Sequence, residues 1–82
     1  MALKYPITTE KAIALIELQN KMLFVVDKNA TKKEIKEEFE KTYGVKVEKV
    51  TTYITTKGEK RAYIKLSKEH SADEIAAKWK IA

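Results

Sequence analysis

The sequence contains no cysteine, and its 82 residues include only two glycines, one proline and one histidine. The absence of cysteine excludes disulfide bonds and thiolate metal sites, and it is consistent with a reducing compartment. Two isolated glycines do not form a phosphate-binding loop of the Walker or Rossmann type. His70 stands beside a predicted helix cap, where a surface position is a simpler reading than a general base. These absences argue against an enzyme and give no reason to expect a cofactor or a metal.

Long hydrophobic runs are also missing. No apolar run exceeds five residues, the length of residues 22–26, which is too short to cross a bilayer. The N-terminus lacks the charged-then-apolar pattern of a signal peptide. We therefore expect a cytoplasmic protein without membrane insertion. A chain of 82 residues is expected to form a single domain, residues 1–82, with a small hydrophobic core.

The positive charge is concentrated in one part of the chain. The net charge is +5, and residues 44–69 alone hold seven Lys or Arg against three acids. A localised basic excess favours a polyanionic partner, whereas an even spread would mainly serve solubility. The abundance of Lys and Glu is also typical of heat-adapted proteins, so charge alone leaves two interpretations open.

The apolar pattern predicts the order of the helices and strands. A first helix begins after Thr8 or Thr9 and ends at Asn20, and a strand follows over residues 22–26. A second helix spans residues 31–43 with Gly44 as its C-cap. A third strand opens at Val45, and a change in its apolar parity predicts a bulge near residues 48–49.

The C-terminal half completes the predicted sheet. Residues 57–60 form a hairpin turn, residues 62–66 form the returning strand, and residues 3–5 suit an extra short strand. Ser71 with Glu74 is a capping box that starts a last helix containing Ile75 and Trp79. The expected fold is α+β, an antiparallel sheet of three to four strands with helices in an α/β/α layered arrangement.

The start of the second helix departs from an electrostatic rule. Thr31 and Glu34 form a capping box, which fixes the helix start. Helix N-termini carry partial positive charge and favour acids, yet the first two helical residues here are Lys32 and Lys33. Backbone donors and cations together suit a bound phosphate. The alternative is that both lysines simply point into solvent.

The hairpin is the second candidate for anion binding. Tyr53 and Tyr63 flank a tip that carries Lys57, Lys60 and Arg61. Lysine and arginine neutralise phosphates, and tyrosine rings stack on unpaired bases, so this mixture favours RNA. The alternative is an ordinary solvated hairpin whose lysines protect an edge strand from aggregation.

Several segments resemble one known family in order along the whole chain. Residues 60–67 (KRAYIKLS), followed by Ile75, resemble the signature of the large-subunit ribosomal protein L twenty-three family. Residues 9–11 and 20–26 resemble its N-terminal block, residues 30–36 its central block, and residues 45–50 its third block. The tight turn of residues 56–61 and the start directly at the first block resemble archaeal members, since bacterial members carry a longer loop and eukaryotic members a basic extension.

The resemblance implies a structural role in the large ribosomal subunit, near the polypeptide exit tunnel. It implies large-subunit ribosomal RNA and neighbouring ribosomal proteins as partners, with the signal recognition particle and the translocon docking at the exit site. Glu10 maps onto the family's exposed docking acid. The positions expected to bind RNA are Lys11, Asn20, Lys21, Lys32, Lys33, Lys36, Thr52, Lys57, Lys60 and Arg61. Thr51 replaces the family's usual asparagine and lacks the paired donor and acceptor of an amide, so no contact is carried over to it.

Two other readings of the same residues remain at this point. The first is a free-standing RNA-binding module, and the second is a protein-interaction domain whose charge serves only solubility.

Overall fold

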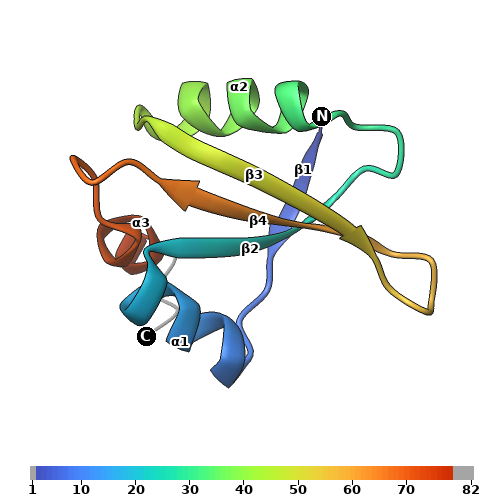
Figure 1. The fold of residues 1–82 in the computed structure, drawn as a ribbon, viewed down its shortest axis with the longest axis horizontal. Coiled ribbons are helices and arrows are strands. Elements are labelled where there is room, and N and C mark those ends of the chain that lie inside the picture. The colour runs from blue at the N-terminus through green and yellow to red at the C-terminus, as the bar shows by residue number, and fades with distance from the viewer. Residues whose placement is uncertain (1, 79–82) are drawn as a thin grey trace.

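The computed structural model describes residues 2–78, which form one antiparallel sheet and three helices (Figure 1). The strand order in the sheet is β1-β2-β4-β3, and every neighbouring pair is antiparallel. In chain order the elements are β1 (Leu3–Pro6), α1 (Glu10–Gln19), β2 (Lys21–Val26), α2 (Lys32–Tyr43), β3 (Val47–Ile54), β4 (Lys60–Leu66) and α3 (Ala72–Lys78).

The helix ends follow the predicted caps. The Thr9 hydroxyl accepts the Ala12 N–H at the start of α1, and Asn20 ends that helix in the left-handed conformation, with φ of 53°. At the start of α2 both bonds of the capping box are present, since the Thr31 hydroxyl accepts the Glu34 N–H and the Glu34 carboxylate accepts the Thr31 N–H, each at 3.1 Å. The predicted first and second helices are therefore confirmed at both ends.

The predicted bulge is present in β3. The pairing of β3 with β4 shifts register between Val47 and Lys49, which restores the apolar parity at Val50. The strand begins at Val47, two residues later than expected, because Val45 follows the left-handed C-cap Gly44 and lies half-buried before the ladder starts. The Glu40 carboxylate on α2 accepts the Val47 N–H at 2.8 Å, which fixes where β3 begins.

The start of α3 corrects one prediction. The Glu74 N–H donates to the carbonyl oxygen of Ser71 at 3.2 Å, and the capping box expected from the Ser71 hydroxyl does not form. The Ala72 N–H donates instead to the side-chain oxygen of Asn20, 52 positions earlier, at 2.6 Å. Asn20, the C-cap residue of α1, therefore caps the start of α3 in place of Ser71, because α1 and α3 pack together. Trp79, expected on this helix, lies outside the described residues.

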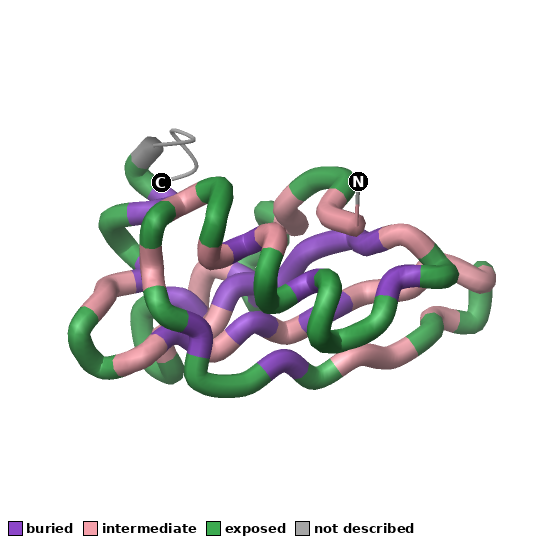
Figure 2. Tube along the Cα trace, turned by 90° about the horizontal axis from the view of Figure 1, so that it is seen from above, coloured by how far each residue is buried: buried purple, intermediate pink, exposed green. Residues whose placement is uncertain are grey.

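The core lies between the sheet and α2 and continues to α3. The alternating residues Ala62, Ile64 and Leu66 of β4 are all 1% exposed or less. Phe39 of α2 is fully buried and meets Phe24 of β2 edge to face, with ring centroids 5.6 Å apart. Figure 2 shows the buried positions recurring along the strands and along one side of the helices. Burial alternates with period two in β4, whereas β2 is buried on both faces from Met22 to Val26, as expected of a central strand.

The helices lie on both sides of the sheet. In Figure 1 α2 lies on one side, and α1 and α3 lie on the other, at the end where β2 begins. The Glu38 carboxylate on α2 accepts the N–H groups of Ala2 and Leu3, each at 2.9 Å, and so ties the edge strand β1 to that helix. The expected α+β fold with helices in an α/β/α arrangement is confirmed. The β3–β4 hairpin extends beyond α1 and α3, which leaves one of its faces open (Figure 1).

Candidate nucleic-acid interface

Three lysines form a row across three neighbouring strands. Lys65 of β4 pairs with Lys21 of β2 on one side and with Lys49 of β3 on the other. Directly opposed residues of antiparallel strands project to the same face, so these three side chains, here called the lysine row, emerge side by side. The only acid within 4 Å of them in residues 2–78 is Glu48, whose carboxylate lies 3.6 Å from the Lys65 ammonium.

A hollow of about 510 Å³ adjoins the lysine row. Lys21 and Lys65 line it together with Asn20, Ser71 and other residues from the end of α1 and the start of α3. Glu17 and Asp73 also line the hollow, so two acidic side chains lie at its wall together with the two lysines. Directly opposed like charges destabilise a sheet, so packing within this chain does not explain the row.

Two tyrosines stack on the same face of the hairpin. The rings of Tyr53 and Tyr63 lie 5.3 Å apart between centroids with an interplanar angle of 25°. Tyr63 is two residues from Lys65 on β4, so both side chains lie on the face that carries the lysine row. Burial raises the pKa of the Tyr63 hydroxyl, and the neighbouring Tyr53 adds to the rise. Both rings are half-buried, which leaves part of each exposed to a ligand.

Arg61 is held in place beside these rings. Its Nε donates to the Glu59 carboxylate at 2.7 Å. This hydrogen bond lowers the pKa of Glu59 and raises the pKa of Arg61. The pair fixes the guanidinium at the hairpin and partly neutralises it, so Arg61 has a structural partner in addition to its predicted RNA role.

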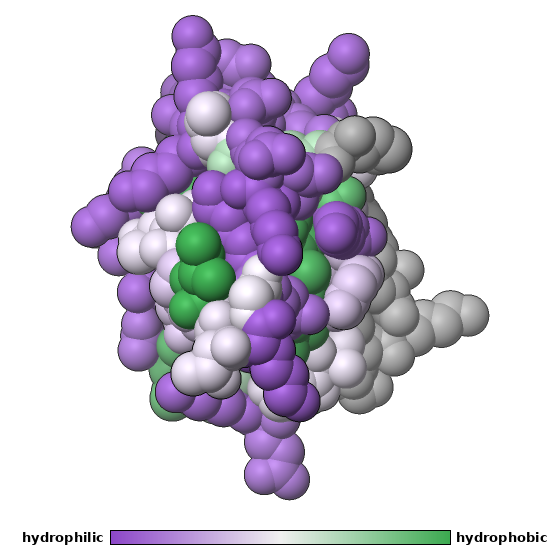
Figure 3. Space-filling view, turned by 90° about the vertical axis from the view of Figure 1, so that its right-hand side faces the viewer, coloured by the Kyte–Doolittle hydropathy of each residue, from purple (hydrophilic) through white to green (hydrophobic). Residues whose placement is uncertain are grey.

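A second basic cluster lies at the far end of the hairpin. Lys4, Lys28, Lys57 and Lys60, here called the hairpin-end cluster, line a hollow of about 230 Å³ together with Glu59. The Lys60 ammonium donates to the carbonyl oxygen of Ala30 at 2.8 Å, which ties the hairpin to the residue before the α2 capping box. Figure 3 shows this end of the molecule, where hydrophilic side chains surround a small hydrophobic area.

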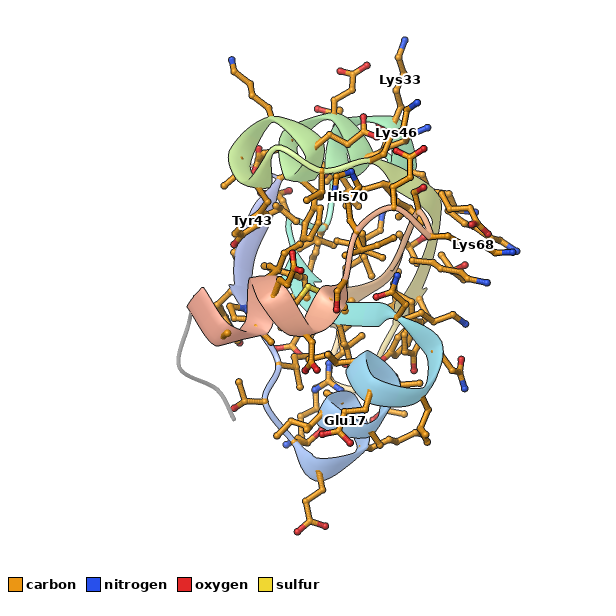
Figure 4. All side chains as sticks on the ribbon, turned by 90° about the vertical axis from the view of Figure 1, so that its left-hand side faces the viewer. Glu17, Lys33, Tyr43, Lys46, Lys68 and His70 are labelled. Atoms are coloured by element: carbon orange, nitrogen blue, oxygen red, sulfur yellow. The ribbon has the colours of Figure 1, made fainter. Side chains whose placement is uncertain are left out.

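The lysines of α2 are exposed as predicted. Lys32, Lys33 and Lys36 lie on the first turns of the helix, and Figure 4 shows Lys33 projecting away from the body of the protein. Because Lys60 bonds to Ala30, the start of α2 and the hairpin-end cluster are neighbours on the surface. The structure thus brings the two regions that the sequence singled out into one basic area.

Other predicted positions have different surroundings. Asn20 uses its amide to donate to the His70 carbonyl at 2.9 Å and its oxygen to accept the Ala72 N–H, so this side chain is engaged within the protein. Thr52 pairs with Ala62, which places it on the face toward α2, away from the lysine row. Glu10 and Lys11 are exposed on the first turn of α1, on the other side of the sheet from α2.

Comparison with known proteins identifies the family of the chain. A family model described as ribosomal protein L23 matches residues 1–76. The chain belongs to the ribosomal protein L23 family. It is 54% identical over 76 residues to "Large ribosomal subunit protein uL23" of Pyrobaculum aerophilum, an alignment that covers 93% of this chain and 94% of that protein. That relative comes from an archaeon, so the resemblance to archaeal members of the family is confirmed.

Four lysines of the two basic groups had no predicted role. Lys49 and Lys65 of the lysine row and Lys4 and Lys28 of the hairpin-end cluster were not among the expected RNA-binding positions. Side chains alternate between the two faces of β3 and β4, and the predicted bulge shifts this alternation in β3. That pattern was the signal in the sequence that Lys49 and Lys65 lie on the same face. Lys4 and Lys28 become neighbours of Lys57 only through the pairing of distant segments, which no local pattern indicates.

Two further observations concern the described part of the chain. No helix within residues 2–78 is both long enough and apolar enough to cross a membrane. In the same residues no three acidic or histidine side chains gather in a way that could hold a metal ion.

Proposed function

We propose that this protein is a structural constituent of the large ribosomal subunit that binds large-subunit ribosomal RNA near the polypeptide exit tunnel. The observation that carries the proposal is membership of the ribosomal protein L23 family over nearly the whole chain. On this proposal the protein is non-enzymatic, acts on the ribosome in the cytoplasm, and has neighbouring ribosomal proteins as partners.

The distribution of charge supports ribosomal RNA as the ligand. The hairpin-end cluster, the first turns of α2 and the lysine row present exposed or half-exposed ammonium groups from separate parts of the chain. Lysines that neutralise phosphates release counterions, which gives RNA binding a strong dependence on salt. The predicted residues Lys32, Lys33, Lys36 and Lys57 have exposed side chains that suit phosphate contacts.

Factor docking is the second part of the proposal. Glu10 is exposed on the first turn of α1, on the side of the sheet opposite α2. An RNA-bound α2 would leave this acid accessible, so α1 can offer a docking position for the signal recognition particle and the translocon. Glu10 also stabilises the helix start through the dipole, and the two roles are compatible.

Co-sedimentation tests the proposal directly. Native extract is separated on a density gradient at moderate salt, and the protein is followed with an antibody. We expect it to travel with the large subunit. Recovery mainly in the soluble fraction would overturn the proposal and favour the alternative, a free-standing RNA-binding module.

A further inference from the structure

The lysine row and the stacked tyrosines share the face of the sheet opposite α2, beside the end of α1 and the start of α3, here called the lysine–tyrosine face (Lys21, Lys49, Lys65, Tyr53 and Tyr63). We propose that this face binds an unpaired RNA segment whose backbone crosses the strands along the lysine row and whose bases stack on the tyrosines. The inference rests on the proposed function and adds to it the kind of RNA that is bound and its direction on the sheet.

The lysine row favours an anionic ligand. Neighbouring strands lie about 4.8 Å apart, so opposed ammonium groups repel one another across both pairings of Lys65. Glu48 neutralises one of the three charges at 3.6 Å, and its carboxylate is half-exposed to solvent. A chain of phosphates along the row removes the repulsion, because each ammonium group then faces a negative charge.

The direction of the row fixes the direction of the ligand. Its members come from β2, β4 and β3 in spatial order, so the row runs perpendicular to the strands. Successive phosphates of one strand can meet successive lysines only if the RNA crosses the sheet in that direction.

The tyrosines indicate unpaired RNA. Tyr63 lies two positions before Lys65 on β4, nearer the hairpin tip, and Tyr53 stacks on it with ring centroids 5.3 Å apart. Bases within a duplex are stacked on each other and cannot reach a flat pair of rings, whereas splayed bases stack on aromatic side chains. Thr51, directly opposite Tyr63, is small and exposed, so it leaves the edge of the Tyr63 ring accessible.

The experiment compares two RNA probes on the full-length chain. Binding of a labelled single-stranded oligonucleotide of mixed sequence and of a duplex hairpin with the same number of phosphates is measured over a series of salt concentrations. We expect the wild-type chain to prefer the unpaired probe. Tyr63→Leu and Tyr53→Leu should each weaken that binding by about five- to hundredfold, while Tyr63→Phe, which keeps the ring, should bind as the wild type does.

Charge variants test the direction of the RNA. Lys21→Gln and Lys49→Gln lie at the two ends of the lysine row, and each should reduce the log–log salt slope for the unpaired probe by about 0.7. Lys41→Gln, on the exposed surface of α2, is the matched control and should leave the slope unchanged. These exposed or half-exposed lysines lie outside the core, so the test holds even where a tyrosine variant fails to fold.

The outcomes separate this inference from the proposed function. If the wild-type chain prefers the duplex, or if the leucine and glutamine variants bind the unpaired probe unchanged, the inference is overturned. Competition by an acidic polypeptide as strong as that by RNA would also overturn it. In those cases co-sedimentation with the large subunit would still stand, whereas loss of co-sedimentation would remove the proposed function itself.

Discussion

Asn20 and Ala72 are 52 positions apart, yet the side-chain oxygen of Asn20 accepts the backbone N–H of Ala72 at 2.6 Å. The amide of the same side chain donates to the His70 carbonyl at 2.9 Å. Asn20 is also the left-handed C-cap of α1. Asn20 thus ends the first helix and fixes the start of the last. Its bond to the His70 carbonyl also ties the connection between β4 and α3 to the end of α1.

Replacement of Asn20 should show that its main contribution is to stability. Asn20→Gly keeps a residue that accepts positive φ but removes the side-chain bonds, so we expect a loss of about 1–3 kcal/mol in the free energy of unfolding. Asn20→Asp keeps the acceptor for Ala72 but places a carboxylate near the His70 carbonyl, and it should destabilise the protein at least as much. Urea unfolding followed by circular dichroism measures both.

RNA binding of the same variants decides the family-based expectation for Asn20. The folded Asn20→Gly protein should bind an RNA fragment with nearly wild-type affinity, because its side chain is already occupied within the chain. A clear loss of affinity without a loss of stability would show instead that Asn20 contacts RNA as the resemblance implied.

Charge reversal at the start of α2 should move stability and RNA binding in opposite directions. Lys32→Glu with Lys33→Glu places acids at the positive end of the helix dipole, which should stabilise the free protein by about 0.3–1 kcal/mol for each substitution. Each lost phosphate contact should lower the salt slope for ribosomal RNA by about 0.7–0.9. Thermal unfolding and filter binding measure the two effects on the same samples.

Lys41→Glu is the control for that double variant. Lys41 lies in the last turn of the same helix, where a basic residue complements the dipole, so the substitution should destabilise the protein slightly. Its salt slope should stay at the wild-type value. An unchanged slope in the Lys32 and Lys33 variant as well would show that the start of α2 does not touch phosphate.

The pair of Glu59 and Arg61 should make stability depend on acid pH. The hydrogen bond from Arg61 lowers the pKa of Glu59, so the pair stabilises the folded state above the usual pKa of a glutamate. That contribution is lost as the pH falls through the lowered pKa of the folded state. The wild type should therefore lose more stability than Glu59→Gln between neutral and strongly acidic pH in parallel urea titrations. Parallel curves for the two proteins would contradict the assignment.

Local signals in the sequence predicted most of the fold. Thr31 with Glu34 fixed the start of α2, Gly44 fixed its end, and the change of parity after Val47 located the bulge. Each of these features depends on residues within a few positions of one another, where hydrogen-bond geometry leaves few choices.

The features that sequence reasoning missed depend on distant contacts. The partners of Asn20, His70 and Ala72, are about fifty positions away, so no local pattern indicates the bonds that its side chain makes within the protein. The lysine row needs the pairing of β2 with β4, and the bond from Lys60 to Ala30 needs the hairpin to fold over the loop before α2. Such juxtapositions follow from the topology of the sheet, which the order of elements restricts but does not determine.

Factor docking at Glu10 can be separated from assembly with a pair of matched variants. Glu10→Gln and Glu17→Gln remove one exposed acid each from the same helix, two turns apart, and Figure 4 shows Glu17 on the side of the sheet away from α2. Both variants should enter the large subunit normally, because neither substitution removes a positive charge. Glu17 lines the hollow beside Lys21 and Lys65, so Glu17→Gln also lowers the negative charge next to the lysine row. Only Glu10→Gln should weaken binding of the signal recognition particle to purified ribosomes, measured by fluorescence titration. Equal affinity of the Glu10→Gln and wild-type ribosomes would restrict Glu10 to its role at the helix start, and an equal loss in both variants would indicate a diffuse electrostatic effect of α1.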